Sequence, residues 1–349
     1  MSMLECRRRK QMEIEEPLRI SINNGPTKEN QKSSTSINGV FLHSQLIIDS
    51  LQRIAPNVRD QDEFLSVCKQ EYKNDASALI KIQEFSEKYS PEDALWWYTR
   101  NTFLYRILNK SLRAFDIHNL FLLRFVIKDL YHQLLRRQSE QSNLSITVYR
   151  DQSMSQEELS RLQQSIDKIV SFNSFLSTSF DRDVCLFIAG DTNNSNERVL
   201  FQIRTHANKC TSSKPFANIA DDSAIPDEEE ILFMLGSLFR LNKISQQDDG
   251  VWLIQMTLCN DDDHDLKPLF EHLRSYGDNP AGALVQFVMH LREGSFYSEA
   301  KSICQRILYE FPPSNDPSRL VREELKSDKK SRFLLDDTSL CLWGICFFM

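Results

Sequence analysis

The stretch PDEEEILF, residues 226–233, runs three consecutive glutamates directly into an aliphatic and aromatic segment. Because the apolar residues favour an extended and buried conformation, the sequence predicts a strand that is preceded by carboxylates. Side chains alternate along a strand, so Glu228 and Glu230 should share one face, about 7 Å apart, and Glu229 should point to the other face. A solvated acidic loop before an ordinary strand is the alternative interpretation.

The composition of the 349-residue chain is that of a globular protein, with 41% hydrophobic and 26% charged residues. Its net charge of -7 gives no reason to expect nucleic acid or an anionic membrane as a partner. The longest apolar run, residues 340–349, is too short to span a bilayer, and residues 1–10 lack the apolar core of a secretory signal. The eight cysteines show no CxxC spacing, so we expect reduced thiols and a cytoplasmic protein.

The pattern of the chain changes three times, which divides it into four segments. Residues 1–38 are predicted to be a disordered N-terminal segment, because residues 21–38 are polar and rich in turn formers. Residues 39–265 begin with helical periodicity and continue, after Ser142, with short runs typical of strands. Residues 266–313 return to helical periodicity, and residues 314–349 read as an irregular or disordered tail. A helical lobe followed by short strands predicts an α+β fold.

The helical lobe contains recognisable helix starts. The sequence Ser90-Pro91-Glu92-Asp93 predicts one, with the serine as N-cap and the proline at the first position. Apolar positions then continue a single helix from Leu95 to Leu112. A second helix is expected from Asp116 to about Arg137. A third is expected from Ser155 to Ile169, where Ser155 and Glu158 have capping-box spacing.

Strands are expected wherever short apolar or alternating runs are bounded by turn residues. The candidate strands are Ser145–Arg150, Asn173–Phe180, Arg198–Arg204, Glu230–Leu235, Ser237–Ile244 and Val251–Leu258.

Three of these strand positions carry short motifs in a fixed order. They are Val148-Tyr149-Arg150, Phe175-Leu176-Ser177-Thr178-Ser179-Phe180 and Glu228-Glu229-Glu230-Ile231-Leu232, with Ala94-Leu95-Trp96-Trp97-Tyr98-Thr99 upstream. Together they resemble the Arg, Ser-Thr-Ser and Glu-x-Glu motifs, and the preceding helix, of arginine-specific mono-ADP-ribosyltransferases of the vertebrate ecto-enzyme and bacterial toxin type. The resemblance covers residues 39–265 and implies a split, mostly antiparallel NAD-binding sheet. It also implies NAD as the donor substrate and a protein arginine as the acceptor.

The resemblance implies a catalytic set of Glu230, Glu228, Ser177 and Arg150. Cleaving the bond between nicotinamide and ribose builds positive charge on the ribose, and a fixed carboxylate stabilises such charge, which is the role implied for Glu230. Glu228 should orient the acceptor guanidinium, whose planar fork favours carboxylates. Ser177 should hydrogen-bond Glu230 and position it, and Arg150 should contact the NAD phosphates and the nicotinamide ribose.

A wider donor-binding set follows from the same resemblance. It consists of Tyr149, Arg150, Asp151, Ser177, Thr178, Ser179, Phe180 and Glu230. Phe180 is a candidate to stack on the nicotinamide, with a place in the core as the alternative. The family usually has glycine where this chain has Asp151, so an added negative charge near the nicotinamide could weaken NAD binding, whereas a backbone contact would survive the change.

No metal is expected, because no pair of histidines or cysteines has ligand spacing. His206, His264 and the aspartates at 261–263 are interpreted as a solvated loop. Residues 282–312 resemble one tetratricopeptide-like repeat, which would offer a surface to a partner protein. Such repeats usually need neighbours to bury their faces.

The sequence thus predicts an NAD-dependent arginine mono-ADP-ribosyltransferase. An NAD glycohydrolase, in which water takes the place of the acceptor, is the alternative within the same chemistry. A non-catalytic scaffold with a transferase fold is the alternative from another class. Residues 220–227, which lead into the three glutamates, are expected to contact the acceptor rather than NAD.

Overall fold

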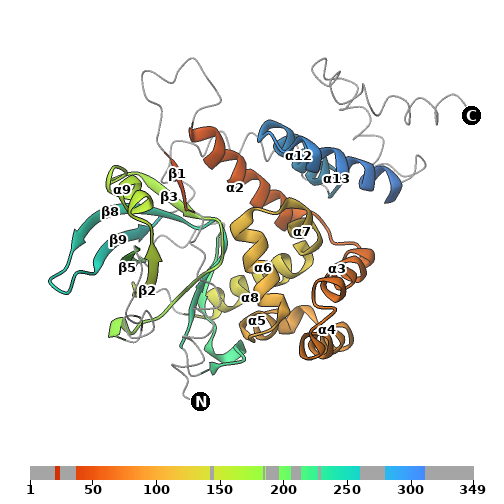
Figure 1. Ribbon diagram of the computed structural model, residues 1–349, viewed down its shortest axis with the longest axis horizontal. Coiled ribbons are helices and arrows are strands. Elements are labelled where there is room, and N and C mark those ends of the chain that lie inside the picture. The colour runs from red at the N-terminus through yellow and green to blue at the C-terminus, as the bar shows by residue number, and fades with distance from the viewer. Residues whose placement is uncertain are drawn as a thin grey trace, which may run out of the picture. The chain divides into compact units, whose positions relative to one another are not determined.

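The computed structural model describes residues 20–23, 37–141, 145–183, 185, 196–205, 214–226, 229–259 and 280–310. The chain divides into two compact units, Met1–Pro268 and Leu269–Met349. The larger unit contains a helical lobe and two β-sheets, and the described part of the smaller unit is a pair of helices (Figure 1).

The helical lobe is built around clustered aromatic side chains. Its elements are α2 (Ile37–Arg53), α3 (Val58–Glu71), α4 (Ala76–Lys88), the 3-10 turn η2 (Pro91–Asp93), α5 (Ala94–Thr99), α6 (Phe103–Ala114), α7 (Ile117–Leu122) and α8 (Arg124–Glu140). The ring of Phe85 packs edge-on against Phe103 at 5.6 Å, against Trp97 at 5.1 Å and against Phe64 at 6.4 Å between centroids. Because these rings come from four helices, their packing fixes the helices to one another.

A buried ion pair adds a polar connection to this lobe. Asp60 forms a capping box with Asn57 at the start of α3, and its carboxylate pairs with the guanidinium of Arg124 at the start of α8. The two side chains are 0% and 3% exposed. Arg124 also donates a 2.7 Å hydrogen bond to the carbonyl of Phe121. The pair therefore joins α3 to the α7–α8 junction inside the lobe.

The helix starts predicted at Asp116 and Ser155 are confirmed, whereas Ser90 precedes the 3-10 turn η2 and makes no capping hydrogen bond. Two of the predicted helices are broken. The predicted helix from Leu95 to Leu112 is interrupted after Thr99, whose hydroxyl donates to the carbonyl of Leu95 at 2.9 Å. This side-chain bond competes with continuation of the helix. The two neighbouring tryptophans of α5 differ in burial, since Trp97 is 1% exposed and Trp96 is 38% exposed.

The second and third predicted helices show similar deviations. Asp116 caps a helix as expected, accepting a 3.1 Å hydrogen bond from the amide of Asn119, but the helix from 116 to 137 is divided into α7 and α8 at Leu123. Helix α9 (Gln156–Gln163) begins with the predicted capping box at Ser155 and stops earlier than predicted. After the helix, Asp167 adopts a left-handed backbone conformation with φ 67°, and strand β3 begins at Ile169.

The strands form two sheets, which confirms the predicted α+β class with a split and mostly antiparallel sheet. The larger sheet has the order β1-β3-β8-β9-β5-β2, and its strands are β1 (Ile20–Asn23), β2 (Thr147–Met154), β3 (Ile169–Phe172), β5 (Glu197–Arg204), β8 (Leu238–Gln246) and β9 (Trp252–Leu258). Its β5–β9 pair is parallel, and its other neighbouring pairs are antiparallel. The smaller antiparallel sheet has the order β4-β7-β6, from β4 (Leu176–Thr178), β7 (Ile231–Phe233) and β6 (Phe216–Asn218).

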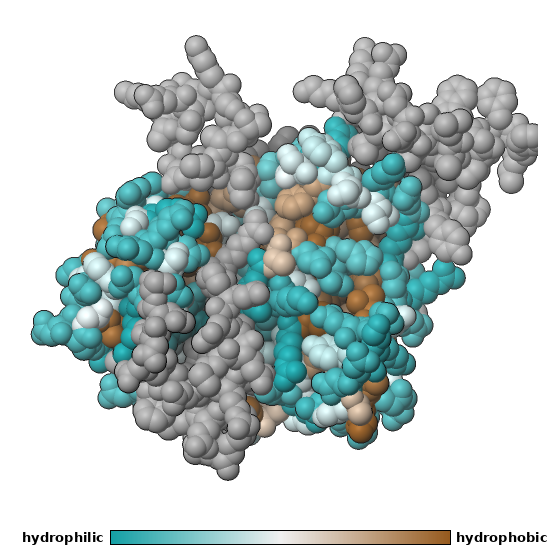
Figure 2. Space-filling model, viewed as in Figure 1, coloured by the Kyte–Doolittle hydropathy of each residue, from teal (hydrophilic) through white to brown (hydrophobic). Residues whose placement is uncertain are grey.

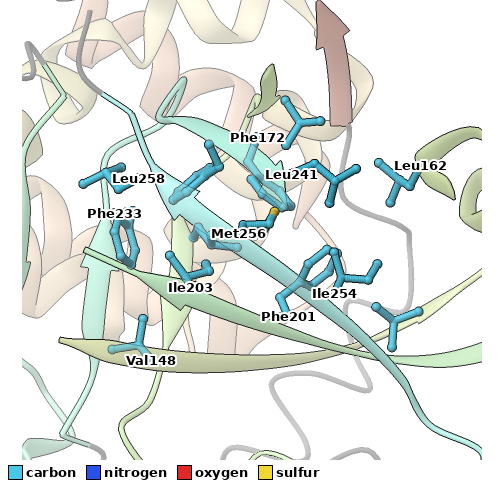
Figure 3. Packing of buried hydrophobic residues seen from close by; sticks show 14 of the residues in the cluster. Val148, Leu162, Phe172, Phe201, Ile203, Phe233, Leu241, Ile254, Met256 and Leu258 are labelled. Atoms are coloured by element: carbon cyan, nitrogen blue, oxygen red, sulfur yellow. The ribbon is translucent and has the colours of Figure 1, made fainter. Parts of the chain in front are cut away.

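One apolar core joins the two sheets (Figure 3). Phe233 on β7 approaches Phe239 on β8 at 5.6 Å between ring centroids, and Phe172 on β3 approaches Phe201 on β5 at 5.5 Å. Phe233 therefore connects the strand that follows the three glutamates to the larger sheet.

Three strands were not predicted, and one of them corrects the N-terminal segment. Residues 20–23, expected to be disordered within 1–38, form β1, in which Ile20 pairs with Phe172 and Ile22 with Val170. The side-chain amide of Asn173 also donates a 2.9 Å hydrogen bond to Ser21. A four-residue strand has little pattern of its own, because its stability comes from a partner far away in the sequence. Strands β3 and β6 were missed for the same reason.

The described part of the smaller unit consists of α12 (Pro280–Glu293) and α13 (Tyr297–Glu310). Ser295 adopts a left-handed backbone conformation with φ 68°, and the amide of Phe296 bonds the carbonyl of Leu291 at 2.7 Å, so the chain reverses tightly. The predicted helical pair is present, and its tetratricopeptide-like character stays a prediction. The predicted tail, 314–349, lies outside the described residues.

Two surface properties bear on the sequence predictions. No helix in the described part of the chain is long and apolar enough to cross a membrane. On the face drawn in Figure 2, hydrophilic side chains predominate and hydrophobic ones form smaller groups. Among the described residues, Cys68 and Cys304 are free thiols.

Candidate functional site

The first two motifs meet where β2 passes β4. The Nη1 atom of Arg150 donates a 2.9 Å hydrogen bond to the carbonyl of Ser177. One position away, the amide and carbonyl of Tyr149 exchange hydrogen bonds of 2.8 and 2.9 Å with those of Ser179. The motif arginine is thus held directly against the backbone of the Ser-Thr-Ser segment.

The third motif is joined to the second through the smaller sheet. Strand β4 pairs with β7 so that Ser177 lies opposite Leu232 and Thr178 opposite Ile231. The Thr178 hydroxyl also donates a 2.8 Å hydrogen bond to the carbonyl of Ile231. Glu230, the residue before β7, is therefore held at the end of β4, and its side chain is buried at 5% exposure.

Tyr98 on α5 lies near both Arg150 and Glu230. Burial raises the pKa of its phenol well above the ordinary value, the charge of Glu230 raises this pKa further, and Arg150 opposes the shift. Its hydroxyl donates to Oδ1 of Asn109 at 3.4 Å, and its ring lies 5.2 Å from that of Phe175. Both motif charges thus act on one buried hydroxyl. The sequence motifs did not single out Tyr98, although it belongs to the upstream segment that resembled the family.

The two faces of β2 have different surroundings. Arg150 lies opposite Phe201 and shares the face of Val148, which belongs to the core between the sheets. Asp151 lies opposite Leu200, on the other face, where Leu200 packs in a cluster with Cys185. Asp151 is 5% exposed, and burial raises its pKa to about 7, with Arg198 and then Arg150 opposing the shift. Its side chain therefore does not share the face of Arg150, and the backbone is the part of Asp151 next to the site.

Tyr149 has the same orientation as Asp151. Its ring packs against the cluster of Cys185 and Leu200, and its hydroxyl accepts a 3.3 Å hydrogen bond from Gln202. The Cys185 thiol donates to the carbonyl of Tyr149 at 3.4 Å. The side chain of Tyr149 is therefore used inside the protein, away from Arg150.

The Ser-Thr-Ser segment divides in a similar way. The buried hydroxyl of Thr178 joins two strands, and the hydroxyl of Ser179 accepts a 3.2 Å hydrogen bond from the amide of Asp181. Phe180 is 41% exposed, so it is not a core residue. The hydrogen bond expected between the Ser177 side chain and Glu230 is absent from the described contacts, and Ser177 instead meets the site through its carbonyl.

The chain at the three glutamates departs from the predicted strand. Glu229 has φ 43°, in the left-handed region, and its amide bonds the carbonyl of Pro226 at 3.3 Å. The chain therefore turns at Glu229, and β7 begins only at Ile231, so strand alternation does not extend to the glutamates. Of the two glutamates that the structure describes, Glu229 is exposed and Glu230 is buried. Glu228 lies outside the described residues.

A pocket of about 440 Å³ opens beside these residues, between the helical lobe and the segment before the glutamates. Its lining residues are Glu84, Lys88, Glu92, Asp93, Trp96, Trp97, Asp221 and Asp222. Arg150, Ser177 and Glu230 do not line this pocket, so it is separate from the place where Arg150 meets Ser177.

The described residues contain no group of three or more His, Cys, Asp or Glu side chains that could hold a metal ion. The histidines at 206 and 264 and the aspartates at 261–263 lie outside the described residues.

The model of the family of NAD:arginine ADP-ribosyltransferases matches residues 63–263, which is more than half of the chain. The protein therefore belongs to this family of transferases, whose donor substrate is NAD. Arg150, the Ser-Thr-Ser segment and Glu230 all lie within the matched residues.

No curated protein matches the chain. Among solved structures, it is similar to the ADP-ribosyltransferase HopU1 of Pseudomonas syringae pv. Tomato DC3000, with 20% identity, a TM-score of 0.39, and 58% of this chain and 98% of that chain covered. The Vis toxin, an ADP-ribosyltransferase from Vibrio splendidus, is 17% identical, with a TM-score of 0.39 and coverages of 62% and 93%. Exoenzyme S from Pseudomonas aeruginosa, solved with human 14-3-3 protein beta and carba-NAD, is 14% identical, with a TM-score of 0.35 and coverages of 61% and 96%.

Proposed function

We propose that the protein transfers a single ADP-ribose from NAD to protein arginine, with release of nicotinamide. The observation that carries the proposal is the meeting of Arg150 with the Ser177 backbone, next to the strand pair that holds Glu230. A permanent cation, a polar backbone edge and a buried carboxylate are then gathered at one edge of the two sheets. These groups fit a donor that carries both phosphates and a ribose.

On the donor side, Arg150 binds phosphate or ribose oxygens through its planar fork, and its bond to Ser177 limits how the guanidinium can turn. Glu230 supplies the negative charge that stabilises the positive charge developing on the ribose as nicotinamide leaves. Its burial makes that charge more effective than it would be in water. The exposed ring of Phe180 stacks on the nicotinamide.

The remaining donor-binding residues act mainly through their backbones. Tyr149 and Asp151 direct their side chains to the opposite face of β2 from Arg150, so their peptide groups border the donor. Thr178 and Ser179 hold the strands in register. The substitution of aspartate for the family's usual glycine is therefore compatible with NAD binding.

On the acceptor side, Glu228 orients the incoming guanidinium and helps to remove its proton. Carboxylates are the natural partners of a guanidinium, because the two groups form paired hydrogen bonds. The segment of residues 220–227 contacts the acceptor.

The test is nicotinamide release from NAD, measured with and without agmatine as an arginine analogue. We expect release that agmatine accelerates, together with an ADP-ribosylated agmatine product detected by mass spectrometry. Release that agmatine does not change would identify an NAD glycohydrolase. No release, with NAD binding absent by calorimetry, would instead identify a non-catalytic scaffold.

A further inference from the structure

The loop between β6 and β7 is attached to the helical lobe by an arginine from α8. The β6–β7 loop begins after Asn218 and ends at Glu230. The guanidinium of Arg137 donates through Nε and Nη2 to the two carboxylate oxygens of Asp222, the Nη2 bond being 2.7 Å long, and through Nη1 to Asp221 at 3.3 Å. The side chains of Arg137 and Asp222 are 20% and 19% exposed, so water screens this two-point pair only in part.

Two uncharged contacts hold the same part of the loop. The Gln141 side chain, just after α8, donates to the carbonyl of Asn218 at 2.7 Å and accepts from its amide at 3.0 Å. On α5, the Thr99 hydroxyl accepts a 2.8 Å hydrogen bond from the amide of Ala224. Hydrogen bonds therefore attach residues 218–224 to the helical lobe at α5 and at the end of α8.

The base of the loop is joined directly to the buried glutamate. The amide of Ile219 donates a 2.9 Å hydrogen bond to the carbonyl of Glu230, which closes the loop. A displacement of residues 218–224 therefore also shifts the part of the loop that leads to Glu230. Asp221 and Asp222 also form one wall of the 440 Å³ pocket, so the same displacement changes the surface next to α5.

We propose that Arg137 is a positioning residue that determines how well the enzyme uses its acceptor. By holding Asp222, it fixes the β6–β7 loop against the helical lobe and so sets the place of the incoming guanidinium. This inference rests on the proposed function. A bulky, planar acceptor requires accurate placement, whereas water does not, so the pair should matter for transfer far more than for NAD hydrolysis.

The first experiment compares transfer and hydrolysis in Arg137→Ala, Arg137→Lys and the wild type. Arg137→Ala should raise the KM for agmatine about tenfold, the scale of a lost charge-assisted hydrogen-bonded pair, and leave the rate of NAD hydrolysis within about twofold. Arg137→Lys should recover part of the loss, because an ammonium keeps the charge but not the fork. Arg161→Ala is the matched control, an exposed arginine on α9, and should change neither quantity.

A second pair of variants tests the loop without changing charge. Thr99→Val removes the hydroxyl that accepts from Ala224 and should raise the KM for agmatine in the same direction, whereas Thr99→Ser keeps the hydroxyl and should not. An unchanged KM in both Arg137→Ala and Thr99→Val would overturn the proposal. So would equal losses of transfer and hydrolysis in either variant.

Hydrogen exchange gives a readout that does not depend on activity. In Arg137→Ala, the amides of Ile219, Asp222 and Ala224 should exchange faster than in the wild type, and in Arg161→Ala they should not. Unchanged exchange in Arg137→Ala would show that Arg137 does not hold the loop. If the wild type releases nicotinamide but does not modify agmatine, the proposed function fails, and exchange alone still decides whether Arg137 positions the loop.

Discussion

Helix α8 carries an arginine near each end that pairs with an aspartate from another segment, and the two pairs differ in their surroundings. At the first end, Arg124 and Asp60 are 3% and 0% exposed and lie inside the helical lobe. At the other end, Arg137 and Asp222 are 20% and 19% exposed and join the lobe to the β6–β7 loop. The same side-chain chemistry is thus used in two dielectric environments.

The difference in exposure predicts which measurement, protein stability or acceptor kinetics, should change when each pair is broken. Breaking a buried pair leaves a charge that water cannot reach, so the cost falls on folding. Breaking a partly exposed pair lets water reach both partners, so folding loses less and the position of the loop changes. We therefore expect Arg124 to appear in stability measurements and Arg137 in acceptor kinetics.

The largest effect is expected where the buried pair is broken. Arg124→Met keeps most of the side-chain volume but leaves the Asp60 carboxylate without its guanidinium, and it should cost about 3 to 5 kcal/mol of unfolding free energy in urea. Arg161→Met, at an exposed position on α9, should stay within about 0.5 kcal/mol of the wild type. A loss below about 1 kcal/mol in Arg124→Met would remove the contrast between the two ends of α8.

The second effect concerns Glu230, at the end of the β6–β7 loop that Arg137 and Asp222 attach to the helical lobe. Glu230→Gln removes the charge proposed to stabilise the ribose, and both transfer and hydrolysis should fall by about two to three orders of magnitude. Stability should change much less than in Arg124→Met, which separates a site charge from a structural one. The measurement is kcat for nicotinamide release with and without agmatine.

Glu229→Gln is the control for this prediction. Glu229 is exposed and adjacent in sequence, so its substitution should leave both rates within about twofold of the wild type. If Glu229→Gln were the more damaging variant, the assignment of Glu230 to the donor side would be wrong.

A smaller effect is expected at Arg150, which we propose to contact NAD directly. Arg150→Lys keeps the positive charge but cannot hold the Ser177 carbonyl and a ligand oxygen with one planar group. NAD affinity by calorimetry should fall about tenfold, and the unfolding free energy should change by less than about 1 kcal/mol. Equal affinity in the two proteins would exclude Arg150 from the donor site.

The sequence predicted the fold where patterns are local. The capping box at Ser155 and the helix start at Asp116 were readable because a few neighbouring residues determine them. Strand β1 was not readable, because Ile20 and Ile22 become a strand only when β3 supplies their partners. The breaks at Thr99 and Leu123 were also missed, since apolar spacing continues through both.

The sequence predicted which residues of the candidate site come together, but not the directions in which their side chains point. The motifs indicated that Arg150, Ser177 and Glu230 belong together, because each brings a group that NAD cleavage requires. They did not reveal that Asp151 faces away from Arg150, because the predicted strand ended at Arg150, whereas β2 continues to Met154. They also did not reveal Arg137, because its partner Asp222 lies far along the sequence and neither residue belongs to a motif.

The smallest effect tests how far the burial argument extends, using a buried aspartate near two arginines. The pKa of Asp151 is raised to about 7 by burial, against about 3.9 for an unfolded aspartate. Between about pH 4 and pH 7, the folded protein therefore binds a proton that the unfolded chain has released, so the stability contributed by this group is lost as the pH rises. Asp151→Asn cannot titrate and should remove this slope, an effect on the order of 1 kcal/mol between pH 6 and pH 8.

Unfolding free energies at pH 6 and pH 8 give the comparison. Asn resembles the protonated aspartate but cannot ionise in the unfolded chain, so Asp151→Asn should be more stable than the wild type at pH 6, and its advantage should be larger at pH 8. Asp248→Asn, in an exposed turn, should follow the wild type at both values. Parallel pH profiles for Asp151→Asn and the wild type would mean that Arg198 and Arg150 keep the carboxylate charged despite its burial. Asp151 would then resemble Asp60, whose buried carboxylate should destabilise the protein only when its arginine partner is removed.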